Sequence, residues 1–171
     1  GCGLGQWLDL VAGRAQIVPL AETAAALDAI PLVLERARPG RLHIGLNDLH
    51  LDLGCRFMFQ PLANGLLDAP TAALREAGIP FGIGGLARLD EGRIPARMVL
   101  GEHARLGSTW AILSRSFHDR STTLEEMQAR IDFAGELQAL RDCHAGWLTA
   151  GPQALADNRA AFRAAVTAAA G

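Results

Sequence analysis

Short apolar runs alternate along the chain with longer stretches that carry apolar residues at helical spacing. The short runs lie at 15–21, 41–45, 79–83 and 108–113, and each has the length and composition of a buried strand. The longer stretches begin and end at Pro and Gly residues, which mark helix boundaries. The pattern therefore predicts strands and helices in alternation over residues 15–121.

The expected helices follow from the spacing of apolar residues and from the turn residues around them. Residues 23–38 are expected to form a helix that Pro31 breaks or kinks, and a short helical turn is expected from Leu49. Helices are also expected over 61–77, ending at Gly78, and from Pro95 to Leu106, ending at Gly107. The opening Gly-Cys-Gly-Leu-Gly is typical of a loop inside a longer protein.

Residues 122–171 are predicted to be helical throughout. Thr122 or Thr123 can cap a long helix that reaches Leu148, and Glu125 and Glu126 suit its N-terminal dipole. A last, Ala-rich helix is expected over 152–170. We expect these helices to cover a barrel or to form an oligomer interface, and we separate them from a first unit, residues 1–121.

The order β-α-β-α-β-α-β-α-α predicts an α/β fold with a parallel sheet. Four βα units make half of an eightfold barrel, and a full barrel needs about 250 residues, against 171 here. The chain is therefore either an open four-stranded sheet or a partial TIM barrel, the C-terminal half of a (β/α)8 barrel with C-terminal helices added. The partial barrel is the fold class we favour.

Composition removes several function classes. All 16 basic residues are Arg, so a Schiff-base lysine and a P-loop lysine are both excluded for this chain. The net charge is -2 with Arg scattered, which argues against nucleic-acid binding. No apolar run is long enough for a membrane span. The three Cys residues lack metal-site spacing, which favours reduced thiols and a cytoplasmic location.

Two acidic residues follow successive predicted strands. Glu22 comes after the first strand and Asp48 after the second. Because parallel strands end at the same edge of a sheet, we expect both carboxylates at that edge, where they could bind Mg²⁺. Each also has a structural alternative: Glu22 as an acid at a helix N-terminus, and Asp48 as the N-cap of a short helix.

The residues around these acids resemble a known family. The strings VPLAET at 18–23 and IGLNDL at 44–49, with Leu53-Gly54 shortly after, resemble the paired metal motifs of the HpcH/HpaI aldolase/citrate lyase family. That family belongs to the phosphoenolpyruvate/pyruvate barrel superfamily. The strings GIGGLAR at 82–88 and EHARLGSTWAILSRSF at 102–117 resemble one of its subgroups, so the resemblance spans roughly residues 15–120.

The resemblance implies a class II, metal-dependent carbon–carbon lyase that acts on a pyruvate-like oxo-acid or a related acyl substrate. Glu22 and Asp48 would hold Mg²⁺, Mn²⁺ or Co²⁺, which would stabilise an enolate. The turn Gly45, Leu46, Asn47, Asp48 would bind the substrate, whose carboxylate would meet the backbone N–H groups of Asn47 and Asp48. The general base would come from the first half of the barrel, and a homo-oligomer is expected.

Some positions depart from the family pattern or allow other functions. Leu20 stands where many members have a substrate-contacting Gln, and Leu46 where many have Pro. Arg88 and Arg115 follow strands and could meet an anionic substrate or form surface ion pairs. His50 could line the site or be a solvated helix residue, and His43 is expected within a strand. A phosphoenolpyruvate-utilising phosphotransfer domain and a non-catalytic half-barrel binding module remain alternatives.

Overall fold

The computed structural model describes residues 4–11, 13–115, 117–118 and 121–171. Its sheet has three parallel strands in the order β1-β2-β3, namely β1 (Leu20–Ala21), β2 (Leu42–Ile44) and β3 (Phe81–Ile83). Parallel bridges Gly82↔Trp110 and Leu86↔Leu113 add a fourth position beside β3. The strands therefore lie side by side in chain order, as right-handed crossovers in one direction would produce.

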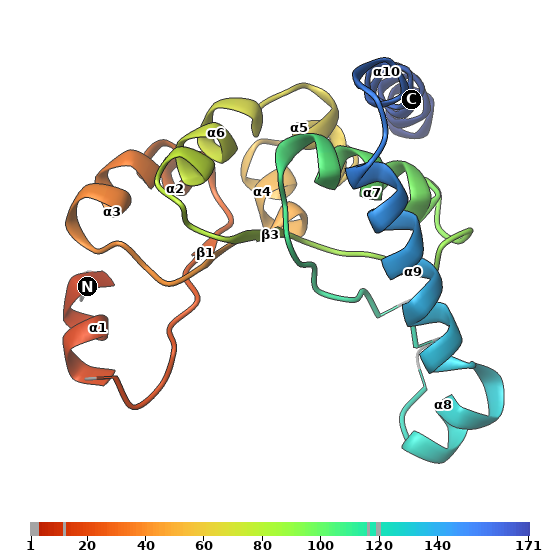
Figure 1. Cartoon of the computed structure of the whole chain (residues 1–171), viewed down its shortest axis with the longest axis horizontal. Helices are drawn as coiled ribbons and strands as arrows, with labels where there is room; N and C mark the ends of the chain where they lie inside the picture. Colours follow the sequence, from red (N-terminus) through yellow and green to blue (C-terminus); the bar gives the residue numbers. More distant parts are fainter. Residues whose placement is uncertain (1–3, 12, 116, 119–120) are drawn as a thin grey trace.

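The helices occupy mainly one side of this sheet. They are α1 (Leu4–Val11), α2 (Ala24–Asp28), α3 (Ile30–Arg36), α4 (Leu46–Asp52), α5 (Gln60–Ala63), α6 (Asp68–Glu76), α7 (Ala96–Leu106), α8 (Leu124–Arg130), α9 (Phe133–Leu148) and α10 (Pro152–Ala170). In Figure 1, α2 to α7 and α10 lie above the sheet, whereas α1 and α8 lie below its opposite ends. The described part of the chain thus forms an arch.

The two faces of the sheet differ in burial. Register pairs Ala21 with Ile44 and Ile44 with Ile83, and these side chains are at most 3% exposed beneath the helices. The alternate row holds Leu20, His43, Gly82 and Trp110, and Leu20 is 54% exposed. Successive residues of a strand point to opposite faces, so the second row lies on the open, lower face of the arch.

The predicted α/β alternation is confirmed, and several boundaries are corrected. Pro31 does divide the helix expected over 23–38, because α3 begins beside it after α2 has ended at Asp28. The helix after β2 begins at Leu46 rather than Leu49. The single helix expected over 61–77 is two helices, α5 and α6, separated by a turn in which Gly65 has a φ of 80°.

The C-terminal prediction also needed correction. The long helix expected from Thr122 or Thr123 to Leu148 is divided into α8, which Thr123 caps, and α9, which Asp132 caps through the N–H of Gly135. The fourth strand is reduced to two isolated bridges. The opening segment was expected to be a loop, yet Leu4–Val11 is helical; residues 1–3 lie outside the described part.

The last two helices pack on α7. The indole Nε1 of Trp147 donates to the Arg97 carbonyl at 2.9 Å, and Nδ2 of Asn158 donates to the Met98 carbonyl at 3.0 Å. Gly101 lets α10 approach, because a Cβ there would collide with the side-chain amide of Asn158. Among the described residues, no helix has the length and apolar character that crossing a membrane requires.

Candidate metal and substrate site

Glu22 lies at the C-terminal end of β1, in a segment held on both sides. Before it, the Ala21 carbonyl accepts a bond from the Gly45 N–H at 3.1 Å. After it, Thr23 caps α2 by accepting from the Ala26 N–H, and the Ala24 N–H donates to Asp52 of α4 at 2.9 Å. The strand end, the cap and α4 together fix where the Glu22 backbone lies.

The half-buried side chain of Glu22 extends over the start of α4. A Cβ at Gly45 would lie 2.7 Å from the Cγ of Glu22, and closer still to one of its carboxylate oxygens. Any larger residue at position 45 would therefore push the carboxylate away. Gly45 is the residue that lets Glu22 occupy this place.

Asp48 lies on the first turn of α4, three residues after Gly45, and is exposed. The N-cap of α4 is Gly45, so the alternative of Asp48 as the N-cap is wrong, although an acid in the first turn still suits the helix dipole. Glu22 precedes the N-cap Thr23 and is not in the first turn of α2. The structure thus brings both acids to the same edge of the sheet.

These two carboxylates are available to a cation. Neither forms a hydrogen bond or ion pair with any other residue in the described ranges. No group of three or more His, Cys, Asp or Glu side chains that could hold a metal ion occurs in those ranges either. The residues present fit an ion that takes two protein oxygens and completes its shell with water and substrate, as Mg²⁺ commonly does.

The turn expected to bind substrate offers mainly its backbone. Gly45 is buried and the Leu46 side chain is 0% exposed within the core, so Leu46 can contribute only main-chain groups. Asn47 and Asp48 are exposed, and their N–H groups belong to the first turn of α4, where no helical carbonyl accepts them. The polar contacts of this turn would therefore come from Asn47 and Asp48.

No hydrogen bond or ion pair among the described residues joins Arg88 or Arg115 to the turn at residues 45–48. Arg88 forms an ion pair at 2.5 Å with Glu91, three residues later in the same loop. Arg115 is exposed and follows the last bridge position. The surface ion pair named as the alternative for Arg88 is confirmed.

Two histidines lie on the elements that carry this turn, His43 on β2 before it and His50 on α4 after it. His43 is 2% exposed within β2, and its ring stacks on Trp110 with centroids 4.6 Å apart. Burial lowers the pKa of His43 below its usual value, so the ring stays neutral. His50, on α4, is half-buried, and its buried Nδ1 has no hydrogen-bond partner within the described ranges, so the expectation of a solvated side chain is only partly met.

Sequence reasoning missed a second polar group, on the helix side of the fourth strand position. His103 of α7, with Arg141 and His144 of α9, lines a cavity there. A signal existed: Val99, His103 and Leu106 follow helical spacing, and all three are buried. The partner helix α9 could not be placed from the sequence, so the cavity between the two helices was not foreseeable.

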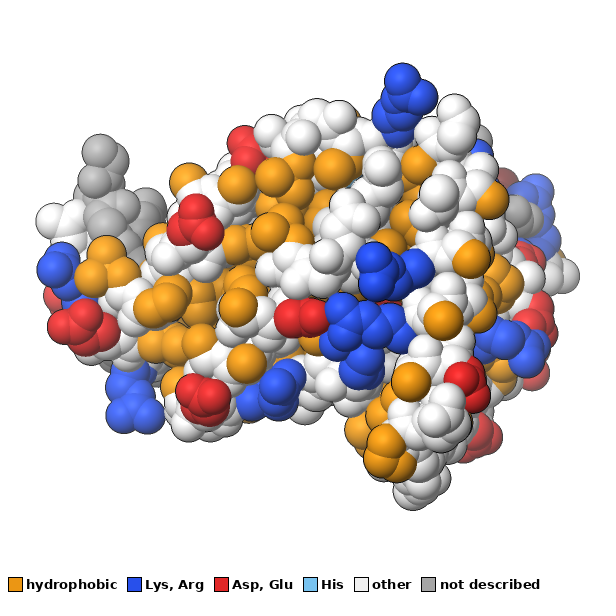
Figure 2. Space-filling view, turned by 90° about the horizontal axis from the view of Figure 1, so that it is seen from above, with side chains coloured by type: hydrophobic (Ala, Val, Ile, Leu, Met, Phe, Trp, Pro, Cys, Tyr) orange, Lys and Arg blue, Asp and Glu red, His pale blue; other side chains and the backbone are white. Residues whose placement is uncertain are grey.

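Surface charge gives no single-sign field on the side where the helices lie. Figure 2 shows Arg side chains in small groups with acidic and apolar side chains between them. Such mixing on this face agrees with the net charge of -2. Comparisons with protein-family models, with curated proteins and with solved structures find no match to the chain.

Proposed function

We propose that this chain is part of a metal-dependent carbon–carbon lyase of the aldolase type, acting on a pyruvate-like oxo-acid or a related acyl substrate. The proposed architecture is the C-terminal half of a (β/α)8 barrel. Strands in chain order, helices on one side and an open opposite face support that architecture. The C-terminal edge of the sheet, where barrel enzymes carry their active groups, holds Glu22 and Asp48.

One observation carries the proposal: two carboxylates from successive strand ends lie at one edge of the sheet, and neither has a hydrogen-bond or ion-pair partner among the described residues. Asp52 and Asp68, in contrast, accept hydrogen bonds from a backbone N–H group and from arginine side chains. Glu22 instead lies over a glycine that makes room for it. This arrangement suits a divalent ion such as Mg²⁺, Mn²⁺ or Co²⁺.

The chain's own groups would have separate tasks. Glu22 and Asp48 would hold the ion, which when bound supplies a Lewis acid for charge that develops on a carbonyl oxygen. The N–H groups of Asn47 and Asp48 would receive the substrate carboxylate, and Leu46 would anchor the turn in the core. The proton-transferring base is proposed to lie in the other half of the barrel.

Metal titration tests the proposal directly. Binding of Mn²⁺, followed by the loss of its free electron-spin-resonance signal, is compared in wild type, Glu22→Gln, Asp48→Asn and Glu35→Gln. Glu35 is an exposed acid of α3 and is the matched control. We expect either site variant to weaken Mn²⁺ binding at least about tenfold, with the control unchanged. Equal binding by all four proteins would remove the metal site.

The open face of the sheet supports a second part of the proposal, namely that the protein forms a homo-oligomer. Leu20 and Ile112 are 54% and 51% exposed on that face, and apolar exposure of this kind favours association. A non-catalytic binding module remains the competing function. It would be favoured if Mn²⁺ bound as expected but pyruvate left the affinity for Mn²⁺ unchanged, because a lyase site should bind the two together.

A further inference from the structure

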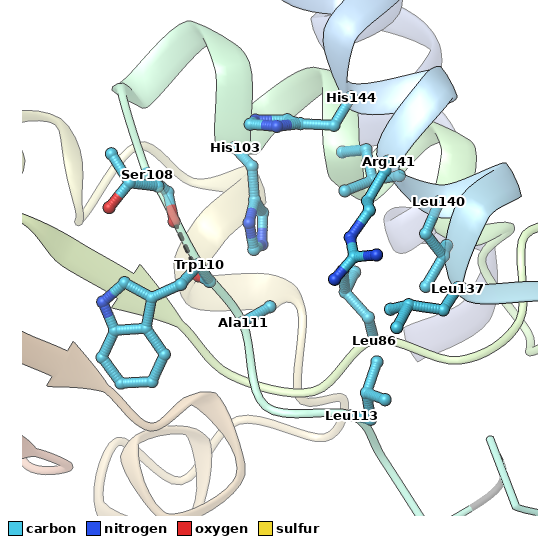
Figure 3. A pocket seen from close by; sticks show the side chains of 12 residues that line it. Leu86, His103, Ser108, Trp110, Ala111, Leu113, Leu137, Leu140, Arg141 and His144 are labelled. Carbon is cyan, nitrogen blue, oxygen red and sulfur yellow. Dashed lines mark hydrogen bonds between the residues drawn. The ribbon is translucent and has the colours of Figure 1, made fainter. Parts of the chain in front are cut away.

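A cavity of about 320 Å³ lies between the fourth strand position, α7 and α9. Its apolar wall consists of Leu86, Leu100, Leu113, Leu137 and Leu140. Figure 3 shows polar side chains directed toward it from two helices: His103 from α7, and Arg141 and His144 from α9. The volume is at the lower end of the range for small-molecule sites, and a leucine wall with a few convergent polar groups is their usual composition.

His103 is the most telling of these side chains. It is 2% exposed, and its Nε2 atom is buried with no hydrogen-bond partner among the described residues. A buried polar atom normally has a partner, and an unpaired one carries a free-energy cost. His144 repeats the pattern, because its Nε2 is also buried and has no hydrogen-bond partner in the described part of the chain. Two unpaired imidazoles that line one cavity indicate that something else satisfies them.

Arg141 supplies the charge. In Figure 3 its guanidinium group extends from α9 into the space between His103 and the leucines. No ion pair or hydrogen bond joins it to a described residue, whereas Arg88, Arg97, Arg105 and Arg159 all pair with acids. Among the residues that the structure describes, no acidic side chain lines the cavity either. The guanidinium group is thus free to pair with an anion that enters the cavity.

We propose that this cavity binds a small monocarboxylate with an apolar body. The carboxylate would pair with Arg141, the apolar part would pack on Leu86, Leu113 and Leu137, and an imidazole Nε2 would supply a further hydrogen bond. The site lies on the helix side of the fourth strand position, whereas Glu22 follows β1 at the far side of β2 and β3. It therefore goes beyond the proposed lyase site and does not depend on it.

The charges of the side chains that line the cavity favour a monocarboxylate over a more highly charged anion. Burial first, and then the neighbouring His144 and His43, lower the pKa of His103 to about 3, and burial lowers that of His144. Both rings are therefore neutral near pH 7, and Arg141 is the one cation among the described residues that line the cavity. One cation suits one carboxylate rather than a phosphate dianion. The leucine wall favours an apolar remainder.

The probe is benzoate, a monocarboxylate with an apolar ring, and the readout is the backbone N–H signal of Trp110 in a nitrogen–proton correlation spectrum. Trp110 lines the cavity, and Trp147, whose indole bonds to the Arg97 carbonyl, is the internal reference. We expect benzoate to shift Trp110 saturably and to leave Trp147 in place. Benzyl alcohol, which lacks the charge, is expected to bind at least about tenfold more weakly.

Three variants separate this site from general binding. Arg141→Met should weaken benzoate about tenfold or more and leave benzyl alcohol unchanged, whereas Arg163→Met, at an exposed position of α10, should change neither. Leu137→Trp, which fills the cavity, should abolish binding of both probes. The proposal is overturned if benzoate fails to shift Trp110, or if Arg141→Met and Arg163→Met bind benzoate equally well.

Discussion

The two faces of the sheet differ in solvent exposure, and the comparison shows which strand residues the helices bury. On the covered face, Ala21, Ile44 and Ile83 are 3%, 0% and 0% exposed. On the open face, Leu20 is 54% exposed although it is next to Ala21 in sequence. Alternation along the strand is enough to separate these environments. The covered face should therefore carry the stability, and the open face should tolerate change.

The open face is not uniform, because Trp110 covers part of it. Its ring lies against His43 and over Gly82, and both of these residues are buried. Farther along the same segment, Ile112 is 51% exposed. Aromatic packing thus protects the middle of the open face and leaves Leu20 and Ile112 to solvent or to a partner. The variants below test this division, in order of expected effect.

The largest effect should come from Ile44→Ala. Ile44 is fully buried between β1 and β3, and removing its methyl groups should lower the free energy of unfolding by about 2–5 kcal/mol. Leu20→Ala, on the open face, should change it by less than about 0.5 kcal/mol. Urea unfolding followed by circular dichroism measures both. If Leu20→Ala costs as much as Ile44→Ala, the open face is covered in solution.

Gly82→Ala should have the next largest effect. A Cβ at this position would lie 2.5 Å from a ring carbon of Trp110 and 2.8 Å from its carbonyl oxygen. The strand bridge leaves the backbone little room to move, so we expect a loss of about 1–3 kcal/mol from overpacking.

The matched control for Gly82→Ala is Gly146→Ala in α9, where no atom lies within 4 Å of the added methyl group. That change should stabilise the helix by about 0.5–1 kcal/mol. The same urea titration compares the two proteins. Equal effects from both glycines would show that the Trp110 ring does not pack on β3.

A third contrast depends on pH. The pKa of His103 is lowered to about 3 in the folded protein, mainly by burial, from an unfolded value of 6.5. Below pH 6.5, His103 binds a proton in the unfolded chain but remains unprotonated in the folded chain. Stability is therefore fully present above pH 6.5 and declines as pH falls toward 3, by at most about 1.4 kcal/mol per pH unit for this one group.

The measurement is urea unfolding at several pH values above and below 6.5, with His103→Gln as the comparison. Gln does not titrate, so its protein should lose less stability on acidification than wild type. His50→Gln is the control, since His50 is only half-buried on α4. Parallel pH profiles for wild type and His103→Gln would mean that the buried ring is not excluded from protonation.

The sequence was sufficient to predict elements that local signals define. Pro31, Gly107 and Pro152 mark helix boundaries through fixed φ, a left-handed C-cap and a first-turn proline, and these boundaries agree with the structure. Glu22 and Asp48 could be assigned to one edge because parallel register follows from the βα alternation. These predictions needed no knowledge of which helix packs on which.

Other features depend on packing between distant segments, so the sequence alone did not reveal them. The division of α8 from α9 occurs at Ile131, which is buried and extended, a position that helical spacing had assigned to one continuous helix. The fourth strand forms only two bridges, at Trp110 and Leu113. The cavity requires α9 to lie against α7, which no local pattern specifies.

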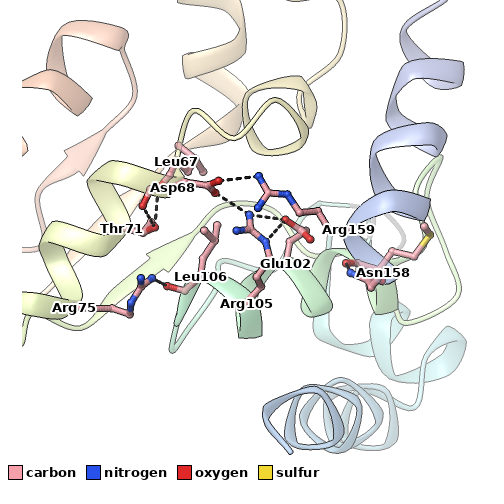
Figure 4. A network of polar contacts seen from close by, with 10 residues as sticks. Leu67, Asp68, Thr71, Arg75, Glu102, Arg105, Leu106, Asn158 and Arg159 are labelled. Atoms are coloured by element: carbon pink, nitrogen blue, oxygen red, sulfur yellow. Dashed lines mark hydrogen bonds and ion pairs between the residues drawn. The ribbon is translucent and has the colours of Figure 1, made fainter. Parts of the chain in front are cut away.

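The smallest effect should come from the ionic cluster that ties the covering helices together. Asp68 of α6 accepts bonds from Arg105 of α7 and Arg159 of α10, at 2.9 and 2.7 Å (Figure 4). Although partial burial acts to raise it, these bonds lower the pKa of Asp68. Its side chain is 39% exposed, so solvent screens the pairs and Asp68→Asn should lower the free energy of unfolding by less than about 1 kcal/mol.

Salt dependence tests whether this loss is electrostatic. The loss should shrink in 1 M salt, where the Debye screening length is about 3 Å. Glu76→Gln, an exposed acid of α6, is the control, and a salt-independent loss in Asp68→Asn would assign its cost to packing instead.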